Sequence, residues 1–266
     1  MAETYLWLNG EILPVDKARI DPTDRGFLLG DGLFETMAAR DGAVLEFPRH
    51  YARLMEGAAF LRLPVPLNQP ALEGCCRALL AANNLAASNM AEAALRLTLT
   101  RGPAPRGLGR PPKTIPTMLI TAAPLPPPGG PLHLITASLR RDETSPLSAL
   151  KTLNYLPNVC ARIEAEEQGA DDALLLNRQG FVAETSAANL FVCLGGQWYT
   201  PPVQDGALPG TRRARLLEQG YVREMPLAPA QLLHAEGVYA GNALSLRPVA
   251  SLDGREIPQC PPGGLS

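Results

Sequence analysis

The sequence predicts a mixed α/β protein with two domains: a smaller N-terminal domain of sheet and helices, and a larger, barrel-like C-terminal domain. In the first half, strand patterns are interspersed with two helical patterns. A stretch rich in proline and glycine, residues 124–131, can hold neither a helix nor a central strand. In the second half, many short strands separated by turn residues indicate a curled sheet. We expect the domains to cover 1–123 and 132–266, with 124–131 as their linker.

Turn residues and periodicity place the elements of the N-terminal half. Asn9-Gly10 and Asp41-Gly42 are dipeptides that favour tight hairpins, so strands are expected on both sides of each. Apolar residues at helical spacing predict two helices, and alternation predicts two further strands. In chain order, these last four elements cover 48–61, 71–83, 95–100 and 117–122.

The same rules predict the elements of the C-terminal half. Gly169 and Gly220 are expected to end helices, since glycine readily adopts the left-handed conformation that follows a helix. Alternating and continuous apolar runs predict the strands. In chain order, the expected elements are a strand at 132–138, a helix at 155–169, strands at 172–176 and 188–193, a helix at 211–220 and a strand that begins at 237.

Composition and charge exclude several classes of function. With 266 residues, 46% hydrophobic and 19% charged, the chain has an ordinary globular balance. A net charge of −2 gives no electrostatic basis for binding nucleic acid or an anionic membrane. No apolar run is long enough to cross a bilayer, and the N-terminus lacks the basic and apolar regions of a signal peptide.

The cysteines and histidines favour a cytoplasmic protein without a metal site. No CxxC pair occurs, and the odd number and scatter of the cysteines argue against a disulfide framework. The three histidines are too dispersed for a metal site with local spacing. The residues concerned are Cys75, Cys76, Cys160, Cys193 and Cys260, and His50, His133 and His234.

Lys151 is the first candidate catalytic residue. It lies in the apolar stretch Ser148-Ala-Leu-Lys-Thr-Leu153, where burial of a cation is costly. A desolvated lysine loses its proton more easily and becomes a nucleophile toward an aldehyde. A buried glutamate nearby, Glu184, could hold a pyridine nitrogen protonated, which pyridoxal phosphate (PLP) requires to act as an electron sink. A lone lysine is more often a solvated surface residue, so the assignment depends on the surrounding motifs.

Six motifs follow one another along nearly the whole chain. They are Asp24-Arg-Gly-Phe-Leu-Leu-Gly-Asp-Gly-Leu-Phe-Glu-Thr36, His50-Tyr-Ala-Arg53-Leu, Lys151-Thr-Leu-Asn-Tyr155, Glu184-Thr-Ser-Ala-Ala-Asn189, Leu208-Pro-Gly-Thr211-Arg and Asn242-Ala-Leu. Together they resemble the fold-type-IV PLP enzymes, the class IV aminotransferase family. This family holds branched-chain aminotransferases, D-amino acid aminotransferases and 4-amino-4-deoxychorismate lyases. Any one motif would be weak, but six in the family's order argue against chance similarity.

The resemblance implies PLP as the cofactor and a role for each motif. Lys151 resembles the Schiff-base lysine, Glu184 the partner of the pyridine nitrogen, and Tyr155 the tyrosine that bonds the phenolic oxygen. The small residues Ser186 and Ala187 would lie near the ring. The implied phosphate contacts are Arg53, Gly210, Thr211, Asn242 and Ala243.

Residue chemistry supports the phosphate contacts independently. The Arg53 guanidinium can bind phosphate oxygens in a bidentate way, although spacing alone favours a solvated arginine on a helix. Gly210-Thr211 opens a predicted helix, where backbone N–H groups and the positive dipole end favour an anion. An ordinary threonine cap is compatible with the same pattern. Asn242 follows a predicted strand, and shaping a turn is its structural alternative.

A loop after the strand at 95–100 carries Arg101 and Arg106, which have no acidic neighbours in sequence. In the family that the chain resembles, the matching loop often enters the partner subunit's active site and binds the substrate carboxylate. Arg106 is therefore the first candidate and Arg101 the second, with Phe34 a further substrate-binding candidate. Two solvated loop arginines are the alternative. The resemblance implies a homodimer with a shared site for a small amino substrate.

The motifs also bear on which reaction is catalysed. Lys151-Thr-Leu-Asn-Tyr lacks the two glycines usual in branched-chain enzymes, whereas Gly241-Asn242-Ala-Leu and Arg106-Gly107 resemble the lyase pattern. We therefore expect a 4-amino-4-deoxychorismate lyase, which forms 4-aminobenzoate and pyruvate for folate synthesis. An aminotransferase acting on D-amino acids, branched-chain amino acids or amines is the alternative. A binding protein that has lost catalysis is the alternative of another class.

Overall fold

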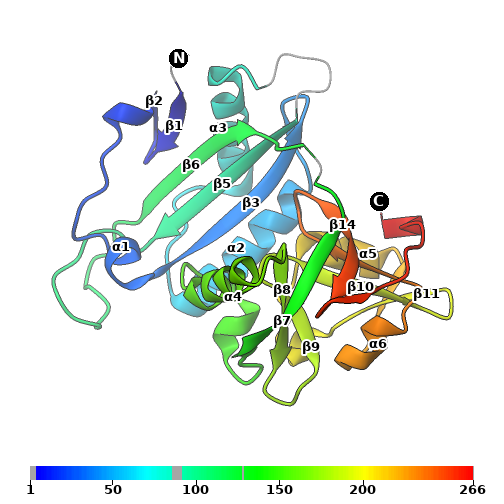
Figure 1. The fold of residues 1–266 in the computed structure, drawn as a ribbon. Helices are drawn as coiled ribbons and strands as arrows, with labels where there is room; N and C mark the ends of the chain where they lie inside the picture. The colour runs from blue at the N-terminus through cyan, green and yellow to red at the C-terminus, as the bar shows by residue number, and fades with distance from the viewer. Residues whose placement is uncertain (1–3, 86–91, 128, 266) are drawn as a thin grey trace. The chain divides into compact units, whose positions relative to one another are not determined.

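The computed structural model describes residues 4–85, 92–127 and 129–265, which belong to two compact units (Figure 1). The first unit comprises Met1–Pro126 and Lys151–Asn154, and the second comprises Pro127–Leu150 and Tyr155–Ser266. The break near residue 126 falls inside the proline-rich segment 124–131. The sequence assigned residues 151–154 to the C-terminal domain, but they return to the first unit because their backbone pairs with a strand there.

The first unit is built on a six-stranded antiparallel sheet with the order β2-β1-β6-β5-β3-β4. Both expected hairpins are confirmed, since β1 and β2 turn at Asn9-Gly10 and β3 and β4 turn at Asp41-Gly42, all with positive φ. The strands are β1 Tyr5–Leu8, β2 Glu11–Pro14, β3 Gly32–Arg40, β4 Ala43–Val44, β5 Glu92–Thr100 and β6 Thr117–Pro124.

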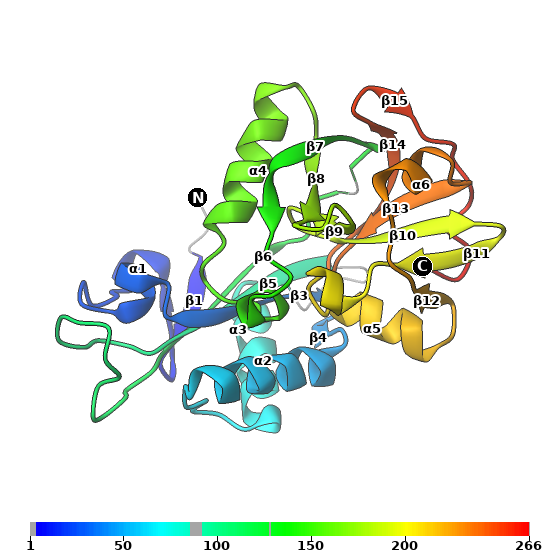
Figure 2. The same cartoon turned by 90° about the horizontal axis from the view of Figure 1, so that it is seen from below.

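Two helices, α2 (Phe47–Leu61) and α3 (Gln69–Ala82), cover one face of this sheet, as Figure 2 shows. Their apolar faces and the inward residues of the strands, such as Leu97, form one core. Because side chains alternate along a strand, Arg96 and Thr98 of β5 face the opposite side from Leu97. The face away from the two helices is therefore available for polar and charged groups.

Glycines of the N-terminal signature allow backbone segments to approach each other closely. Gly30 ends the short helix α1 (Arg25–Leu29) with a φ of 65°, the left-handed conformation that glycine favours. A Cβ on Gly30 would lie 2.6 Å from the side-chain oxygen of Asn154, and one on Gly32 would lie 2.4 Å from the carbonyl oxygen of Leu99. A larger residue at Gly32 would push β3 away from β5, and one at Gly30 would be strained by its φ and displace the Asn154 side chain.

The second unit is built on a nine-stranded mixed sheet with the order β12-β11-β10-β13-β14-β7-β8-β9, and β15 pairs with β14. The pairs β11–β12, β14–β7 and β7–β8 are parallel. In Figure 2, β7 and β10 run in clearly different directions, so the sheet curls as the sequence predicted. The strands are β7 Leu132–Arg141, β8 Asp172–Asn177, β9 Val182–Thr185, β10 Asn189–Leu194, β11 Gln197–Thr200, β12 Val222–Glu224, β13 Gly237–Gly241, β14 Leu246–Leu252 and β15 Arg255–Glu256.

Three α-helices accompany this sheet. The first of them packs its Ala161 and Ala165 on β7 and β8. Gly169 and Gly220 follow the first two helices with positive φ, which confirms the expected helix ends. The helices are α4 Leu156–Glu167, α5 Thr211–Glu218 and α6 Pro229–Leu233, and the 3-10 turns of the whole chain are η1 Val15–Lys17, η2 Pro146–Ala149, η3 Val203–Asp205 and η4 Gly263–Leu265. Among the described residues, no helix is both long and apolar enough to cross a membrane.

Candidate active site

Lys151 lies on an extended segment that pairs with the beginning of β3. The Phe34 N–H donates to the Lys151 carbonyl at 3.0 Å, and the Leu153 N–H donates to the Gly32 carbonyl at 3.0 Å. Leu33 and Thr152 complete an antiparallel bridge between them. The backbone of the candidate lysine is thus held by a strand from the N-terminal signature, while its side chain is half-buried.

Two cationic side chains lie against the ring of Phe34. The Lys151 Nζ is 4.2 Å from the ring centroid, and the Arg96 guanidinium carbon is 4.0 Å from it. The ring is buried, whereas Arg96 is exposed. An aromatic face stabilises nearby cations, and a guanidinium is well suited to bind a carboxylate. Arg96, which sequence analysis did not single out, therefore shares the Phe34 ring with Lys151.

Arg53 pairs with a buried carboxylate on β3. Its Nε and Nη2 donate to the two carboxylate oxygens of Glu35 at 2.8 and 2.6 Å, and the His50 Nδ1 lies 2.7 Å from Glu35 Oε2. Burial would raise the pKa of Glu35, but Arg53 and then His50 outweigh this and hold that pKa below its ordinary 4.5. Arg53 thus neutralises a carboxylate under α2, and its contact with a phosphate stays a prediction.

The two loop arginines have different surroundings. The buried Arg101 guanidinium donates to both carboxylate oxygens of Asp31, at 2.8 and 3.0 Å, and to the carbonyl oxygens of Leu61 and Arg62. Arg106 is exposed. The donors of Arg101 therefore already bind groups of the first unit, and substrate binding by Arg106 stays a prediction.

Arg25 holds the loop backbone just after Arg106. Its Nη1 donates to the carbonyl of Gly107 at 2.8 Å, and its Nη2 donates to the carbonyl of Leu108 at 3.2 Å. Its Nε donates to Asp31 at 2.7 Å, so Asp31 accepts from both Arg25 and Arg101. This network anchors the base of the loop while the Arg106 side chain remains exposed.

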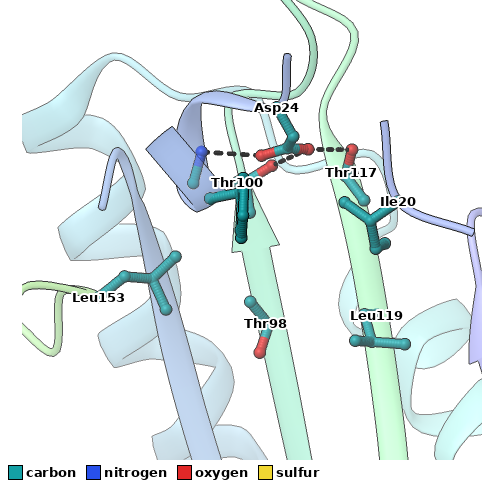
Figure 3. A pocket seen from close by; sticks show the side chains of 9 residues that line it. Ile20, Asp24, Thr98, Thr100, Thr117, Leu119 and Leu153 are labelled. Carbon is teal, nitrogen blue, oxygen red and sulfur yellow. Dashed lines mark hydrogen bonds between the residues drawn. The ribbon is translucent and has the colours of Figure 1, made fainter. Parts of the chain in front are cut away.

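A cavity of about 220 Å³ lies beside α1 on the face of the sheet away from α2 and α3 (Figure 3). The fully buried Asp24 accepts hydrogen bonds from the hydroxyls of Thr100 at 2.9 Å and Thr117 at 2.7 Å. These bonds tie β5 and β6 to the first turn of α1. The cavity lining is Ile20, Asp24, Gly26, Phe27, Thr98, Thr100, Thr117, Leu119 and Leu153.

In the second unit, the buried Glu184 on β9 contacts a backbone N–H and an arginine. Its Oε2 accepts from the Leu208 N–H at 2.9 Å, and its Oε1 lies 3.1 Å from Nη2 of Arg141. Arg141 also donates to the carbonyl oxygens of Gly206 at 3.0 Å and Ser148 at 2.7 Å. Arg141, a second residue that sequence analysis missed, therefore fixes the orientation of the predicted pyridine-nitrogen partner.

Turns of the second unit meet at Asn242. Its Nδ2 donates to the Ala187 carbonyl at 3.1 Å, and its Oδ1 accepts from the Ser245 N–H at 3.0 Å. The Nε of Arg212 donates to the Asn242 carbonyl at 2.8 Å, and Arg212 directly follows Thr211 in α5. The Asn242 turn is thus hydrogen-bonded to Ala187 and to the first turn of α5.

The N-cap residue of α5 is Gly210, which has no side chain to cap the first-turn N–H groups. A Cβ on Gly210 would lie 2.0 Å from Oδ1 of Asn189, so a larger residue there would displace the Asn189 side chain. The Nδ2 of Asn189 donates to the Leu208 carbonyl at 2.8 Å and fixes the turn that precedes the helix. The first-turn N–H groups and the helix dipole favour an anion such as a phosphate at this position.

The remaining predicted residues lie in the same unit. The Ser186 hydroxyl donates to Asp172, and the Ser186 carbonyl accepts from Nδ2 of Asn158 at 2.8 Å. Tyr155 immediately precedes α4, and Ala243 follows Asn242; both are half-buried. In the described ranges 4–85, 92–127 and 129–265, no cluster of histidine, cysteine, aspartate and glutamate is arranged to hold a metal ion.

The fold and these residues define a family. The model of the amino-transferase class IV family matches residues 32–252, and the chain belongs to this family. It is accordingly an enzyme of a group whose members use PLP in transaminase or lyase reactions.

Similar proteins include both aminotransferases and lyases. The "Putative branched-chain-amino-acid aminotransferase" of Methanocaldococcus jannaschii is 36% identical over 261 residues, 95% of this chain and 89% of that protein. A branched-chain amino acid aminotransferase structure from Escherichia coli has a TM-score of 0.88 and 26% identity, with 98% of this chain and 90% of that chain covered. A 4-amino-4-deoxychorismate lyase structure from Pseudomonas aeruginosa has a TM-score of 0.82 and 31% identity, covering 96% and 94%.

The residues described above fit PLP, the cofactor of the family. The N-terminus of α5 suits a phosphate dianion because its backbone N–H groups and the helix dipole favour an anion and its N-cap is a glycine. The buried and oriented Glu184 suits a protonated ring nitrogen. The half-buried amine of Lys151 suits covalent attachment of an aldehyde.

Proposed function

We propose that this enzyme is a 4-amino-4-deoxychorismate lyase. The main support is that Arg96 and Lys151 both lie against the ring of Phe34. The exposed Arg106 is on a loop of the same unit. The substrate has one amine and two carboxylates, so it calls for one reactive lysine and two arginines. The Asn242-Ala-Leu turn, which resembles the lyase pattern, and the similarity to the Pseudomonas aeruginosa lyase also support this choice.

Each residue has a defined task in this reaction. Bound PLP supplies an electron sink for the pair of electrons left when a C–H bond next to the substrate nitrogen breaks. The Lys151 amine accepts that proton as a general base. The Glu184 carboxylate holds a proton on the pyridine nitrogen, and Arg141 keeps this carboxylate in place. Arg96 and Arg106 orient the substrate through its carboxylates.

The overall reaction balances without an external oxidant or acceptor. The substrate loses the proton at the carbon that bears its amine, and the bond between the ring carbon and the enolpyruvyl oxygen breaks. The ring becomes aromatic as 4-aminobenzoate, and the side chain leaves as pyruvate. The proton removed from the ring is returned to the leaving group, so no keto acid is consumed.

An aminotransferase is the second candidate, and one observation favours it. The relative at 36% identity is named a branched-chain aminotransferase, and Arg96 beside Lys151 suits a single α-carboxylate equally well. The same base and the same glutamate serve both reactions. The two differ in whether the amino group stays with the enzyme after the first product leaves.

A product assay separates the two. The holoenzyme is incubated with 4-amino-4-deoxychorismate and no keto acid, and the lyase forms equal amounts of 4-aminobenzoate and pyruvate over many turnovers. Separately, D-alanine or a branched-chain amino acid is added alone. Complete bleaching of the cofactor absorbance by such a donor, recovered only when a keto acid is added and accompanied by no 4-aminobenzoate formation, would replace the lyase by the aminotransferase.

The loop of Arg106 supports a further part of the proposal: a homodimer in which this arginine serves the partner's site. A Lys151→Ala chain, inactive alone, mixed with an Arg106→Ala chain, whose KM is raised, should form sites with the wild-type KM. At equal mixing, roughly a quarter of the sites are then intact, because half the dimers are hybrids with one complete site. Absence of recovery despite subunit exchange verified by mass spectrometry would show that each chain uses its own Arg106.

A further inference from the structure

Two thiols lie side by side where the C-terminal segment crosses the second unit's sheet. Cys193 on β10 is directly opposite Gly237 on β13. A Cβ on Gly237 would lie only 2.5 Å from the sulfur of Cys260, so that sulfur occupies the space of the missing side chain. Directly opposed residues in antiparallel strands point their Cβ atoms to the same face about 5 Å apart. The sulfurs of Cys193 and Cys260 are therefore neighbours on one face of the sheet.

The surroundings of Cys193 keep it in the thiol form. Cys193 is buried, and its thiol donates to Oε2 of Glu236 at 3.6 Å. Burial, followed by the neighbouring Cys260 and Glu236, raises the pKa of the Cys193 thiol to about 11. Cys260 is half-buried and thus more accessible to a small reagent. The pair consequently combines one accessible sulfur with one protected sulfur.

The segment that carries Cys260 is attached to the rest of the unit by noncovalent contacts. The Tyr239 hydroxyl donates to the Cys260 carbonyl at 2.8 Å, and Leu265 is completely buried. The Leu265 carbonyl accepts from Nη1 of Arg212 at 3.3 Å, and Nε of the same arginine donates to the Asn242 carbonyl. The C-terminal segment is therefore linked through one side chain to the Asn242 turn.

We propose that Cys193 and Cys260 form an oxidative modification site, at which a peroxide converts the two thiols into a disulfide that fastens the C-terminal segment to β10. Neither cysteine belongs to the catalytic motifs, so the disulfide would form whichever reaction the enzyme catalyses.

The chemistry proceeds in two balanced steps. The Cys260 thiolate attacks one oxygen of hydrogen peroxide, the O–O bond breaks, and sulfenic acid and hydroxide result. The Cys193 sulfur then attacks the sulfenic sulfur, the S–S bond forms and the S–O bond breaks. The Cys193 proton leaves with that oxygen as water. In total, two thiols lose two electrons and two protons, and one peroxide becomes two waters.

The direct test is mass spectrometry of the full-length holoenzyme after mild peroxide treatment, denaturation and alkylation. The untreated protein should carry five alkyl groups, one for each cysteine. The treated protein should lose two of them and weigh about 2 Da less before alkylation. Peptide mapping should join the peptides of Cys193 and Cys260. Exposed Cys160 serves as the internal control for reaction with peroxide.

Variants make the assignment specific. Cys193→Ser and Cys260→Ser should each abolish the mass loss, whereas Cys75→Ser should leave it unchanged. The disulfide should raise the melting temperature of the wild-type protein by roughly 5 °C, reversibly with a thiol reductant. Oxidation of Cys160 with Cys193 and Cys260 still fully alkylated, or a cross-link between Cys75 and Cys76 instead, would overturn the proposal.

Glu236 provides a second measurement. In the wild-type protein, Glu236 accepts a hydrogen bond from the Gly196 N–H at 3.1 Å. Glu236→Gln removes the negative charge beside Cys193 but keeps an oxygen that can accept this bond. Loss of the charge should lower the pKa of the Cys193 thiol and speed closure of the disulfide by about threefold or more. An unchanged or slower rate would contradict the part that Glu236 plays in keeping the pair reduced.

Discussion

Glu35 in the first unit and Glu184 in the second are both buried carboxylates on β-strands, and each pairs with an arginine. Glu35 is surrounded by Arg53 and His50, two residues of one helix, which together satisfy both oxygens. Glu184 is held by Arg141 on one oxygen and a backbone N–H on the other. The first arrangement neutralises a charge under a helix. The contacts of Glu184 orient its carboxylate beside Leu208, in the turn that leads to Gly210 and Thr211.

Matched amide substitutions should separate these two roles most strongly. Glu184→Gln should lower kcat by about 100-fold or more, because a charge aimed at the reacting system is lost. Glu35→Gln should lower the free energy of unfolding by about 3 kcal/mol, because Arg53 loses its buried counter-charge, while kcat at saturating PLP stays near wild type. Steady-state kinetics and urea unfolding of both variants test this. Similar effects of the two substitutions on kcat would remove the distinction.

We expect Arg141 to contribute both to the orientation of Glu184 and to the free energy of unfolding. Arg141→Met removes the guanidinium that pairs with Glu184. It also removes the hydrogen bonds that Arg141 donates to the carbonyl oxygens of Gly206 and Ser148. We expect a loss of about 3 kcal/mol in the free energy of unfolding and a kcat reduced by roughly tenfold. The neighbouring Arg140 is exposed and donates to the nearby Ala137 carbonyl, so Arg140→Met is the matched control. Equal behaviour of the two variants in thermal unfolding and kinetics would rule out this role.

The two loop arginines extend the comparison to substrate binding. Arg101→Ala should lower the free energy of unfolding by about 2 kcal/mol or more, because Asp31 loses a bidentate partner. Arg106→Ala should leave the unfolding curve unchanged and raise the KM for the substrate by about tenfold, as expected for one lost carboxylate contact. A raised KM for the Arg101 variant with normal stability would reverse the preference for Arg106.

The pH dependence of unfolding should reflect the carboxylates of the first unit. Burial raises the pKa of Glu35, but Arg53 and His50 lower it further, so the folded pKa lies below the unfolded value of 4.5. Such a group gives its full stabilisation above pH 4.5, and this is lost as the pH falls through the folded pKa. Urea unfolding between pH 7 and pH 3 should show this loss, with a shallower slope in Glu35→Gln. Identical slopes in the two proteins would contradict the assignment.

Local patterns were sufficient for much of the fold. The dipeptides Asn9-Gly10 and Asp41-Gly42 specify their turns within a few residues, and Gly169 and Gly220 mark helix ends in the same way. The short elements β9, β12 and α6 were missed because three to five residues show too little periodicity to distinguish a strand from a turn.

The parts of the site that the sequence did not predict depend on contacts between distant residues. Lys151 belongs to the first unit only because its segment pairs with Gly32 and Phe34, and no local pattern encodes that pairing. Arg96 looks like any exposed arginine on an alternating strand until Phe34 is seen beneath it. Arg141 lies far from Glu184 in sequence, so its ion pair is visible only in the folded chain.

The central claim is that Lys151 is the residue to which PLP is attached. Reduction of the purified holoenzyme with borohydride makes the link permanent, and peptide mapping by mass spectrometry then locates the pyridoxyl group. The chain has two other lysines, Lys17 and Lys113, which serve as internal controls. The account predicts one pyridoxyl group per chain, on Lys151, and none in a Lys151→Ala variant. A label on Lys17 or Lys113, or no label in a chain that still contains bound PLP, would contradict it.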